Sequence, residues 1–442
     1  MKRRLFFLER ILYGDGNTPF NGVFVLKLRG IVETERLVGA LERIQRKYAL
    51  LRARVEKDAA GVPWFVVHSE VPPIPLRIAD RRTNMDWIEE SRRQWAEPFA
   101  TWKGPLLRVV LLRGDQEPVG DEGSMVDQEP VADLIMAFHH CLCDGGSAMA
   151  LMRDILFLLD EPGGDIGDAG DLVTMDELMP GTSLGKRIKV RSISRLIRAG
   201  LSAGALLTSS RGKGSIPRSA DYLLHWKLDS ELSAALFRYC KSAQVTVNTL
   251  LCVAAVYAFR YIRGRKAHQV VTCPVDIRRY HPAIKKDMLF AFGLAVTLSL
   301  KKRRSDSFAG LVQEAQQLMT GKLGKLNATE FLLTMEHSHA AVGAMIKVLT
   351  YGKPGNDLMF SNMGRLEIPE SYSSFEVETI YSPTVIGPYR NPTTLVTTTY
   401  KGQLDFSLVS NRMVLSEDEG RAIRDTILGL LEEVAKPLKY SV

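Results

Sequence analysis

The sequence has few cysteines and no long uncharged apolar segment. Both shortages limit the classes of protein to which it can belong. It holds five cysteines in 442 residues, an odd number at scattered positions. A small secreted fold held by disulfides would need a denser set, so we expect reduced thiols and a cytoplasmic location. The longest nearly uncharged apolar run, residues 245–259, is shorter than the ~20 residues that a membrane-spanning helix needs. The sequence therefore predicts no transmembrane segment.

Acidic residues are missing from one stretch of an otherwise mixed chain. The net charge is +8, and nine Lys and Arg residues lie between Lys186 and Arg218 without a single Asp or Glu. Without these nine residues the rest of the chain would be close to neutral, so the basic character is local. No nucleic-acid reading motif accompanies the stretch, and we therefore exclude nucleic acid as a partner.

The length and the pattern of apolar residues predict an α/β protein of two similar units. A chain of 442 residues is about three times the usual size of one domain. Stretches with strand and helix periodicity alternate in both halves. We predict an N-terminal half over residues 1–178, a basic linker over 179–220 and a C-terminal half over 221–442.

Individual elements follow from the same periodicities. Apolar runs at 106–112 and 132–138 predict an antiparallel hairpin around an acidic loop, followed by a helix at 147–159 with Ser147 as its N-cap. In the second half we predict one continuous helix at 329–349 and strands at 357–361 and 394–400, with no strand between those two.

The sharpest local signal is the run Phe138-His-His-Cys-Leu-Cys-Asp-Gly-Gly-Ser147. It places two adjacent histidines at the end of an apolar strand, followed by an aspartate and two glycines before a helix. This pattern predicts a sharp loop that presents an imidazole at a cleft, with glycines where the backbone turns. An imidazole can remove a proton from an alcohol or amine near neutral pH.

At these residues the sequence resembles a known superfamily. The run HHCLCDG fits HHxxxDG, the signature of the chloramphenicol-acetyltransferase-like acyltransferases, which include peptide-synthetase condensation domains and polyketide-associated and alcohol acyltransferases. The runs RKYALLRARV, VTVNTLLCVAAVYAFR, VVTCPVDIRR and FSNMG are similar to other segments of this superfamily. The resemblance implies two α/β sandwich domains in a pseudo-dimer, with an active-site tunnel between them.

The resemblance also implies roles for single residues. His140 would be the general base, or would position the attacking hydroxyl or amine. Asp144 would hold the loop by pairing with Arg278 in VVTCPVDIRR. His139 and Gly145 would support the loop.

Further expectations concern substrates and partners. Ser361 and Asn362 in FSNMG would line the tunnel. The donor would be a thioester of coenzyme A or of an acyl carrier protein's phosphopantetheine, the acceptor an alcohol or amine, and no metal or permanently bound cofactor is implied. We expect a free-standing monomeric enzyme. The alternatives are a condensation or epimerisation-type domain acting on carrier-bound substrates, and a non-catalytic docking module of the same fold.

Two rival chemistries use the same run of residues. A zinc site would need His139 and His140 to converge, but adjacent residues of a strand point to opposite faces. A covalent acyl-enzyme on Cys141 or Cys143 would need easy alignment with His140, which their short spacing does not provide. We therefore favour direct transfer.

The basic stretch 186–218 has three interpretations. It could be a solvated linker, a basic amphipathic helix that makes peripheral contact with anionic lipid, or a patch that steers an acidic carrier protein or the phosphates of coenzyme A. The sequence leaves these interpretations open.

Overall fold

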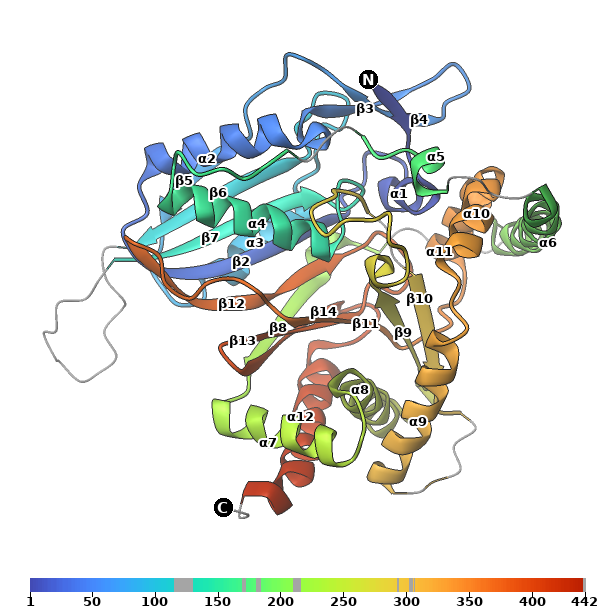
Figure 1. The fold of residues 1–442 in the computed structure, drawn as a ribbon. Helices are drawn as coiled ribbons and strands as arrows, with labels where there is room; N and C mark the ends of the chain where they lie inside the picture. The colour runs from blue at the N-terminus through green and yellow to red at the C-terminus, as the bar shows by residue number, and fades with distance from the viewer. Residues whose placement is uncertain are drawn as a thin grey trace, which may run out of the picture.

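The computed structural model describes residues 1–114, 130–168, 172–179, 184–209, 216–291, 294–301, 305 and 307–439, with the backbone alone at 184–191, 207–209 and 437–439. The chain forms two α/β lobes, each built on its own sheet (Figure 1). The predicted acidic loop at 115–129 lies outside the described residues.

The sheet of the N-terminal lobe has five strands in the order β12-β2-β7-β6-β5. Helices α2 and α4 cover one face, and α3 packs on the other. The predicted hairpin is present as the antiparallel pair β6 and β7. The bounds are β2 Asn21–Gly30, β5 Leu76–Asp80, β6 Leu107–Gly114, β7 Val131–His139, α2 Thr34–Lys47, α3 Asp86–Ala96 and α4 Gly145–Asp160. A small sheet of β1 Lys2–Arg4, β4 Pro63–Val67 and β3 Ala53–Lys57 lies beside this lobe.

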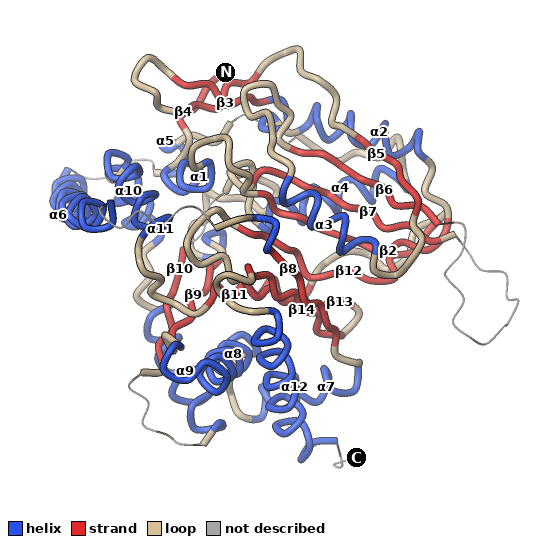
Figure 2. The backbone as a smooth tube through the Cα atoms, turned by 180° about the vertical axis from the view of Figure 1, so that it is seen from behind, coloured by secondary structure: helices blue, strands red, loops and turns tan. Residues whose placement is uncertain are grey.

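The sheet of the C-terminal lobe has six strands in the order β10-β9-β11-β13-β14-β8. Helices α7, α8, α9 and α12 contribute to one apolar core against this sheet (Figure 2). The strands are β8 Asp221–Lys227, β9 Val270–Val275, β10 Leu294–Ser299, β11 Leu358–Arg365, β13 Thr394–Tyr400 and β14 Gln403–Asn411. The helices are α7 Ser230–Ser242, α8 Val247–Arg263, α9 Phe308–Leu323 and α12 Glu417–Lys439.

Strand β12, Phe375–Ile386, leaves the C-terminal half and joins the N-terminal sheet beside β2. We had predicted no strand between 361 and 394, and this prediction was wrong. Pro383 lies inside the strand, and its pairing with β2 shifts register around Val377 and again around Tyr381. The run FEVETIY at its start has the alternation and the β-branched and aromatic residues of a strand, and the prediction overlooked it; Pro383 and the irregular register interrupt the pattern beyond this run. The exchange ties the two halves together.

The segment that we predicted as a basic linker contains a long helix, α6 (Leu184–Ser209). It packs along α10 (Ala328–His337) and α11 (Val342–Tyr351) at the edge of the molecule. These two helices correct the single helix predicted at 329–349. The chain turns at Ser338, whose N–H binds the carbonyl of Met335 three residues earlier and so tightens the end of α10. The short helices α1 (Phe7–Tyr13) and α5 (Met175–Leu178) complete this side.

No single helix among the described residues is both long and apolar enough to cross a membrane. Helices α7 and α8 meet the length and composition requirements only as a pair, bent by 106°.

Candidate active site

The HHxxxDG loop connects β7 to α4, and its ends are fixed by the strand and the helix. Asn21 of β2 pairs with His139, the last residue of β7. Asp144 is the N-cap of α4, because its carboxylate accepts from the N–H of Ser147 at 2.8 Å. The prediction that Ser147 caps this helix was wrong: the helix begins two residues earlier, at Gly145. The loop is thus a short connection with both ends hydrogen-bonded.

His140 is held by one ring nitrogen. Nδ1 lies 3.1 Å from the carbonyl oxygen of Cys143. A carbonyl can only accept, so Nδ1 carries the proton and Nε2 keeps its lone pair. Burial lowers the pKa of His140 below its usual value, against the opposing effects of the Cys143 carbonyl and of Asp144. The imidazole is therefore neutral at pH 7, with Nε2 as the basic atom.

His139 has a different environment. Its side chain is buried, and its Nδ1 accepts from the N–H of Cys141 at 3.3 Å. Burial, together with the adjacent His140, lowers its pKa to about 3. The ring lies close to the rings of Tyr13 and Phe99. His139 is thus a neutral packing residue, consistent with support of the loop.

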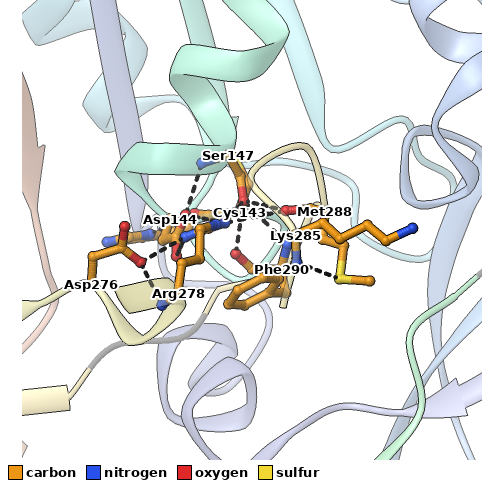
Figure 3. A network of polar contacts seen from close by, with 9 residues as sticks. Cys143, Asp144, Ser147, Asp276, Arg278, Lys285, Met288 and Phe290 are labelled. Atoms are coloured by element: carbon orange, nitrogen blue, oxygen red, sulfur yellow. Dashed lines mark hydrogen bonds and ion pairs between the residues drawn. The ribbon is translucent and has the colours of Figure 1, made fainter. Parts of the chain in front are cut away.

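Asp144 joins the loop to the other lobe through Arg278, as Figure 3 shows. Arg278 Nη1 donates to Asp144 Oδ2 at 2.8 Å, and Nη2 donates to Oδ1 at 3.1 Å. Arg278 follows β9 in the C-terminal lobe, and only 7% of its side chain is exposed. Asp276 also contacts Nη1, at 3.2 Å. This two-pronged pair fixes the loop against the opposite lobe.

Ser147 makes a second connection between the lobes that sequence reasoning missed. Its Oγ accepts from Arg278 Nη2 at 2.8 Å and lies 3.0 Å from the carbonyl of Met288 (Figure 3). The backbone N–H of Asp144 donates to the carbonyl of Phe290 at 2.9 Å, and the Phe290 ring stacks under the Arg278 guanidinium. Backbone carbonyls carry no sequence signal, so only the serine after the glycines could have indicated this contact.

Phe20 was also missed by the sequence reasoning. Its carbonyl accepts from the backbone N–H of His140 at 2.7 Å, and its ring meets the imidazole edge-on at 5.4 Å. The ring of Tyr389 lies 5.7 Å from the ring of Phe20. Phe20 immediately precedes Asn21, so the β2–β7 register would have placed it beside His140. An apolar wall therefore shields one side of the imidazole.

The two glycines after Asp144 leave room for side chains of the other lobe. Both lie in the first turn of α4, so a special backbone turn does not explain them. A Cβ at Gly145 would lie 2.7 Å from Sδ and Cε of Met363, and one at Gly146 would lie 3.1 Å from Arg278 Nη1. Our interpretation of Gly145 as a backbone turn is corrected to one of space for Met363.

The half-buried Ser361 and Asn362 immediately precede Met363 in β11, near an irregularity in its pairing with β13. The Asn362 side chain accepts from the N–H of Gly364, which has a φ of +72°. This local bond shapes the strand end that carries Met363 to the loop. A tunnel-lining role for Ser361 and Asn362 stays a prediction.

Gly145→Ala is expected to destabilise the protein by about 1 kcal/mol, because the new methyl group must displace the flexible end of Met363. In a Met363→Ala background, Gly145→Ala should cost clearly less than it does in the wild type, because the clashing side chain is gone. Gly39→Ala in α2 is the control, since its Cβ meets nothing within 4 Å. It should leave stability unchanged or raise it slightly. Denaturant unfolding measures all of these variants, and an equal cost of Gly145→Ala in the wild-type and Met363→Ala backgrounds would refute the contact.

The rival chemistries find little support in this geometry. Cys141 and Cys143 are fully buried, and burial raises the pKa of both thiols well above the usual range. A buried neutral thiol is a poor nucleophile. Among the residues that the structure describes, no three His, Cys, Asp or Glu side chains are placed to hold a metal ion.

Comparison with known proteins places both halves of the chain. Residues 1–160 match the condensation domain family, and residues 219–417 match the C-terminal family of phthiocerol/phthiodiolone dimycocerosyl transferases. The chain belongs to the HHxxxDG acyltransferase superfamily. Both matched segments bear on the site, since the first contains the HHxxxDG loop and the second contains Arg278 and β11.

Curated relatives in this superfamily are much longer than the chain. Bacitracin synthase 3 of Bacillus licheniformis is 29% identical over 160 residues, which are 36% of this chain and 2% of that protein. Phosphinothricin tripeptide synthetase PhsC of Streptomyces viridochromogenes is 25% identical over 349 residues, or 73% of this chain and 29% of that protein. The chain thus spans a small part of these two proteins.

Solved structures share the fold over nearly the full length. The trichothecene 15-O-acetyltransferase of Fusarium sporotrichioides superposes with a TM-score of 0.71 at 12% identity, covering 98% of this chain and 94% of the other. The first condensation domain of the CDA synthetase superposes with a TM-score of 0.70 at 17% identity, covering 99% of this chain and 97% of the other. Polyketide synthase associated protein 5 of Mycobacterium tuberculosis superposes with a TM-score of 0.63 at 15% identity, and 97% of each chain is covered. The two-lobed fold of this superfamily is therefore shared.

Proposed function

We propose that the protein transfers an acyl group from a thioester to a hydroxyl or amine, with His140 as the general base. The observation that carries this proposal is the state of the imidazole. Nδ1 is bound to the Cys143 carbonyl, Nε2 keeps its lone pair, and the lowered pKa keeps the ring neutral. Such a ring can accept a proton at neutral pH.

The reaction consists of two steps around one imidazole. Nε2 takes the proton from the acceptor as its oxygen or nitrogen attacks the thioester carbonyl. The tetrahedral intermediate then expels the thiolate, the C–S bond breaks, and the His140 imidazolium returns the proton to the sulfur. The acyl group never resides on the protein, in keeping with the buried Cys141 and Cys143. The two lobes accelerate the reaction by holding donor and acceptor together at this imidazole.

Asp144 is a positioning residue in this proposal. Its carboxylate oxygens are used by Arg278 and by the N–H of Ser147. It therefore sets the place of the loop, and with it the direction of Nε2, without handling a proton of the substrate. Ser147 and Arg278 act with it.

The superfamily supports two kinds of donor, a coenzyme A thioester and a carrier-bound thioester. We favour ester formation by a single acyltransferase, in line with the match of residues 219–417 to a transferase family. The second candidate is condensation of two carrier-bound substrates, which the match of residues 1–160 to condensation domains supports.

A panel of acyl thioesters tests the proposal. Coenzyme A and carrier-bound donors are incubated with alcohol and amine acceptors, and products are identified by intact mass. Acylated acceptor from either donor supports acyl transfer. A free alcohol as the working acceptor favours the single acyltransferase, and a carrier-bound amine as the only working acceptor favours condensation. Stable binding of donors without any turnover would instead support a non-catalytic docking module.

The pH dependence of kcat/KM should show one acidic limb. The neutral form of His140 is the active one, so activity falls as pH drops through a pKa that lies below the usual 6.5. With an alcohol acceptor, which does not ionise in this range, the rate should be flat from pH 7 to about pH 8. A half-maximal rate above pH 7 would contradict a base whose pKa is lowered by burial.

A further inference from the structure

The inner face of helix α6 packs against two neighbouring helices. Ser194 Oγ donates to the carbonyl of Thr334 in α10 at 3.2 Å. Ten residues further on, a Cβ at Gly204 would lie 3.4 Å from Val348 in α11. The helix therefore runs alongside both α10 and α11. Its buried and half-buried side chains between 192 and 206 are Ile193, Ser194, Ile197, Leu201 and Ala205.

The outer face of α6 is unusual for a surface helix. Leu196 is 74% exposed and Leu206 is 76% exposed, although a solvent-facing helix side is normally polar. At 3.6 residues per turn they fall on one stripe with the exposed Ala199 and Ala203. Leu196 and Leu206 are thus exposed to solvent on one side of the helix, about 15 Å apart along its axis.

Arginines accompany this apolar stripe. Arg195 and Arg198 are both exposed beside this stripe. At 3.6 residues per turn Arg195 falls next to Leu206, and Arg198 lies on the flank of the stripe, nearer the buried side. No acidic residue occurs anywhere from 179 to 220, so the helix offers these arginines no partner of its own. We call Arg195, Leu196, Arg198, Ala199, Ala203 and Leu206 the outer face of α6.

We propose that the outer face of α6 is the surface by which this protein binds an anionic membrane. Leucines can enter the boundary between headgroups and acyl chains, while arginines bind lipid phosphates. The face is a single convex helix at the edge of the molecule (Figures 1 and 2). A convex strip of leucines fits a deformable lipid surface without a preformed groove. An acidic protein partner would need a complementary apolar groove for the leucines as well as carboxylates for the arginines, whereas an anionic membrane needs no such groove.

The position of α6 determines which part of the protein would face the membrane. Helices α10 and α11 lie between α6 and α1. An apolar cluster of Phe7, Ile11 and Val342 joins α1 to α11, and Tyr389 packs on it. Tyr389 in turn contacts Phe20, the neighbour of His140. A membrane-bound α6 would therefore hold the lobe interface near the lipid surface. The binding itself does not depend on the proposed acyl transfer.

Sedimentation with vesicles tests the proposal. The full-length protein is mixed with vesicles of phosphatidylcholine alone or with added phosphatidylserine. We expect binding to the anionic vesicles and at least tenfold weaker binding to the neutral ones. Leu196→Ser/Leu206→Ser and Arg195→Gln/Arg198→Gln should each weaken anionic binding about tenfold or more, and added salt should weaken the wild type.

Matched controls come from other exposed sites. Leu318→Ser in α9 and Lys286→Gln remove a leucine and a positive charge that are 49% and 85% exposed. Both should leave vesicle binding unchanged, and all variants should keep the wild-type melting temperature. Absence of wild-type binding, or an equal loss in the controls, would overturn the proposal. It would also be overturned if the α6 variants bound vesicles normally but used a carrier-bound donor poorly, since the face would then serve an acidic protein.

Discussion

Replacing His140 with Ala is expected to lower kcat/KM for acyl transfer by about 10²- to 10⁴-fold, the usual contribution of a general base. The loss should appear mainly in kcat, because the imidazole acts on the acceptor's proton in the transition state. Steady-state kinetics with the best thioester from the donor panel measures this effect.

His140→Asn is the sharper variant. Its amide nitrogen can replace Nδ1 in the bond to the Cys143 carbonyl, but asparagine offers no basic atom in place of Nε2. The fold should therefore be preserved while activity falls as far as in His140→Ala, and the acidic limb of the pH profile should vanish. A folded His140→Asn protein with wild-type turnover would exclude His140 as the base.

Asp144→Ala should reduce both activity and stability. It removes the N-cap of α4 and leaves the largely buried Arg278 without its main partner. Breaking such a pair costs about 3 to 5 kcal/mol, and we expect the lower end because Asp276 still contacts Arg278. Urea unfolding measures the stability, and kcat/KM reports the displacement of the loop.

A double-mutant cycle separates the ion pair from the cap. Arg278→Met should also destabilise, and Asp144→Ala/Arg278→Met should cost clearly less than the sum of the single changes. Asp144→Asn keeps a capping oxygen but removes the charge, so it should retain more stability than Asp144→Ala. If Asp144→Ala unfolds at the same urea concentration as the wild type, the pair does not hold the loop.

Much of the local site could be predicted from the sequence because its residues are adjacent in the chain. The motif placed His139, His140 and Asp144 between a strand and a helix, as found. Arg278 was reached only through the family resemblance, since 134 residues separate it from Asp144. Met288 and Phe290 contribute backbone carbonyls, which any residue type supplies.

The parts of the fold that sequence reasoning missed depend on contacts between distant segments. β12 begins with the strand-like run FEVETIY, but Pro383 and the register shifts interrupt the pattern, and nothing in the sequence shows that it pairs with β2 of the other half. A basic amphipathic helix was one of three interpretations of 186–218, but the sequence did not show that the inner face of α6 packs against α10 and α11. By contrast, β13 has the predicted bounds because a run of β-branched residues marks it.

The most direct test of the account is a single-turnover measurement of thiol release and acceptor acylation in the same sample. Wild-type protein should release one thiol for each acylated acceptor, only when the acceptor is present, and the protein itself should gain no acyl mass. His140→Asn should show neither product at a comparable rate. Acceptor acylation by His140→Asn at the wild-type rate, or an acyl group trapped on Cys141 or Cys143, would contradict direct transfer with His140 as the base.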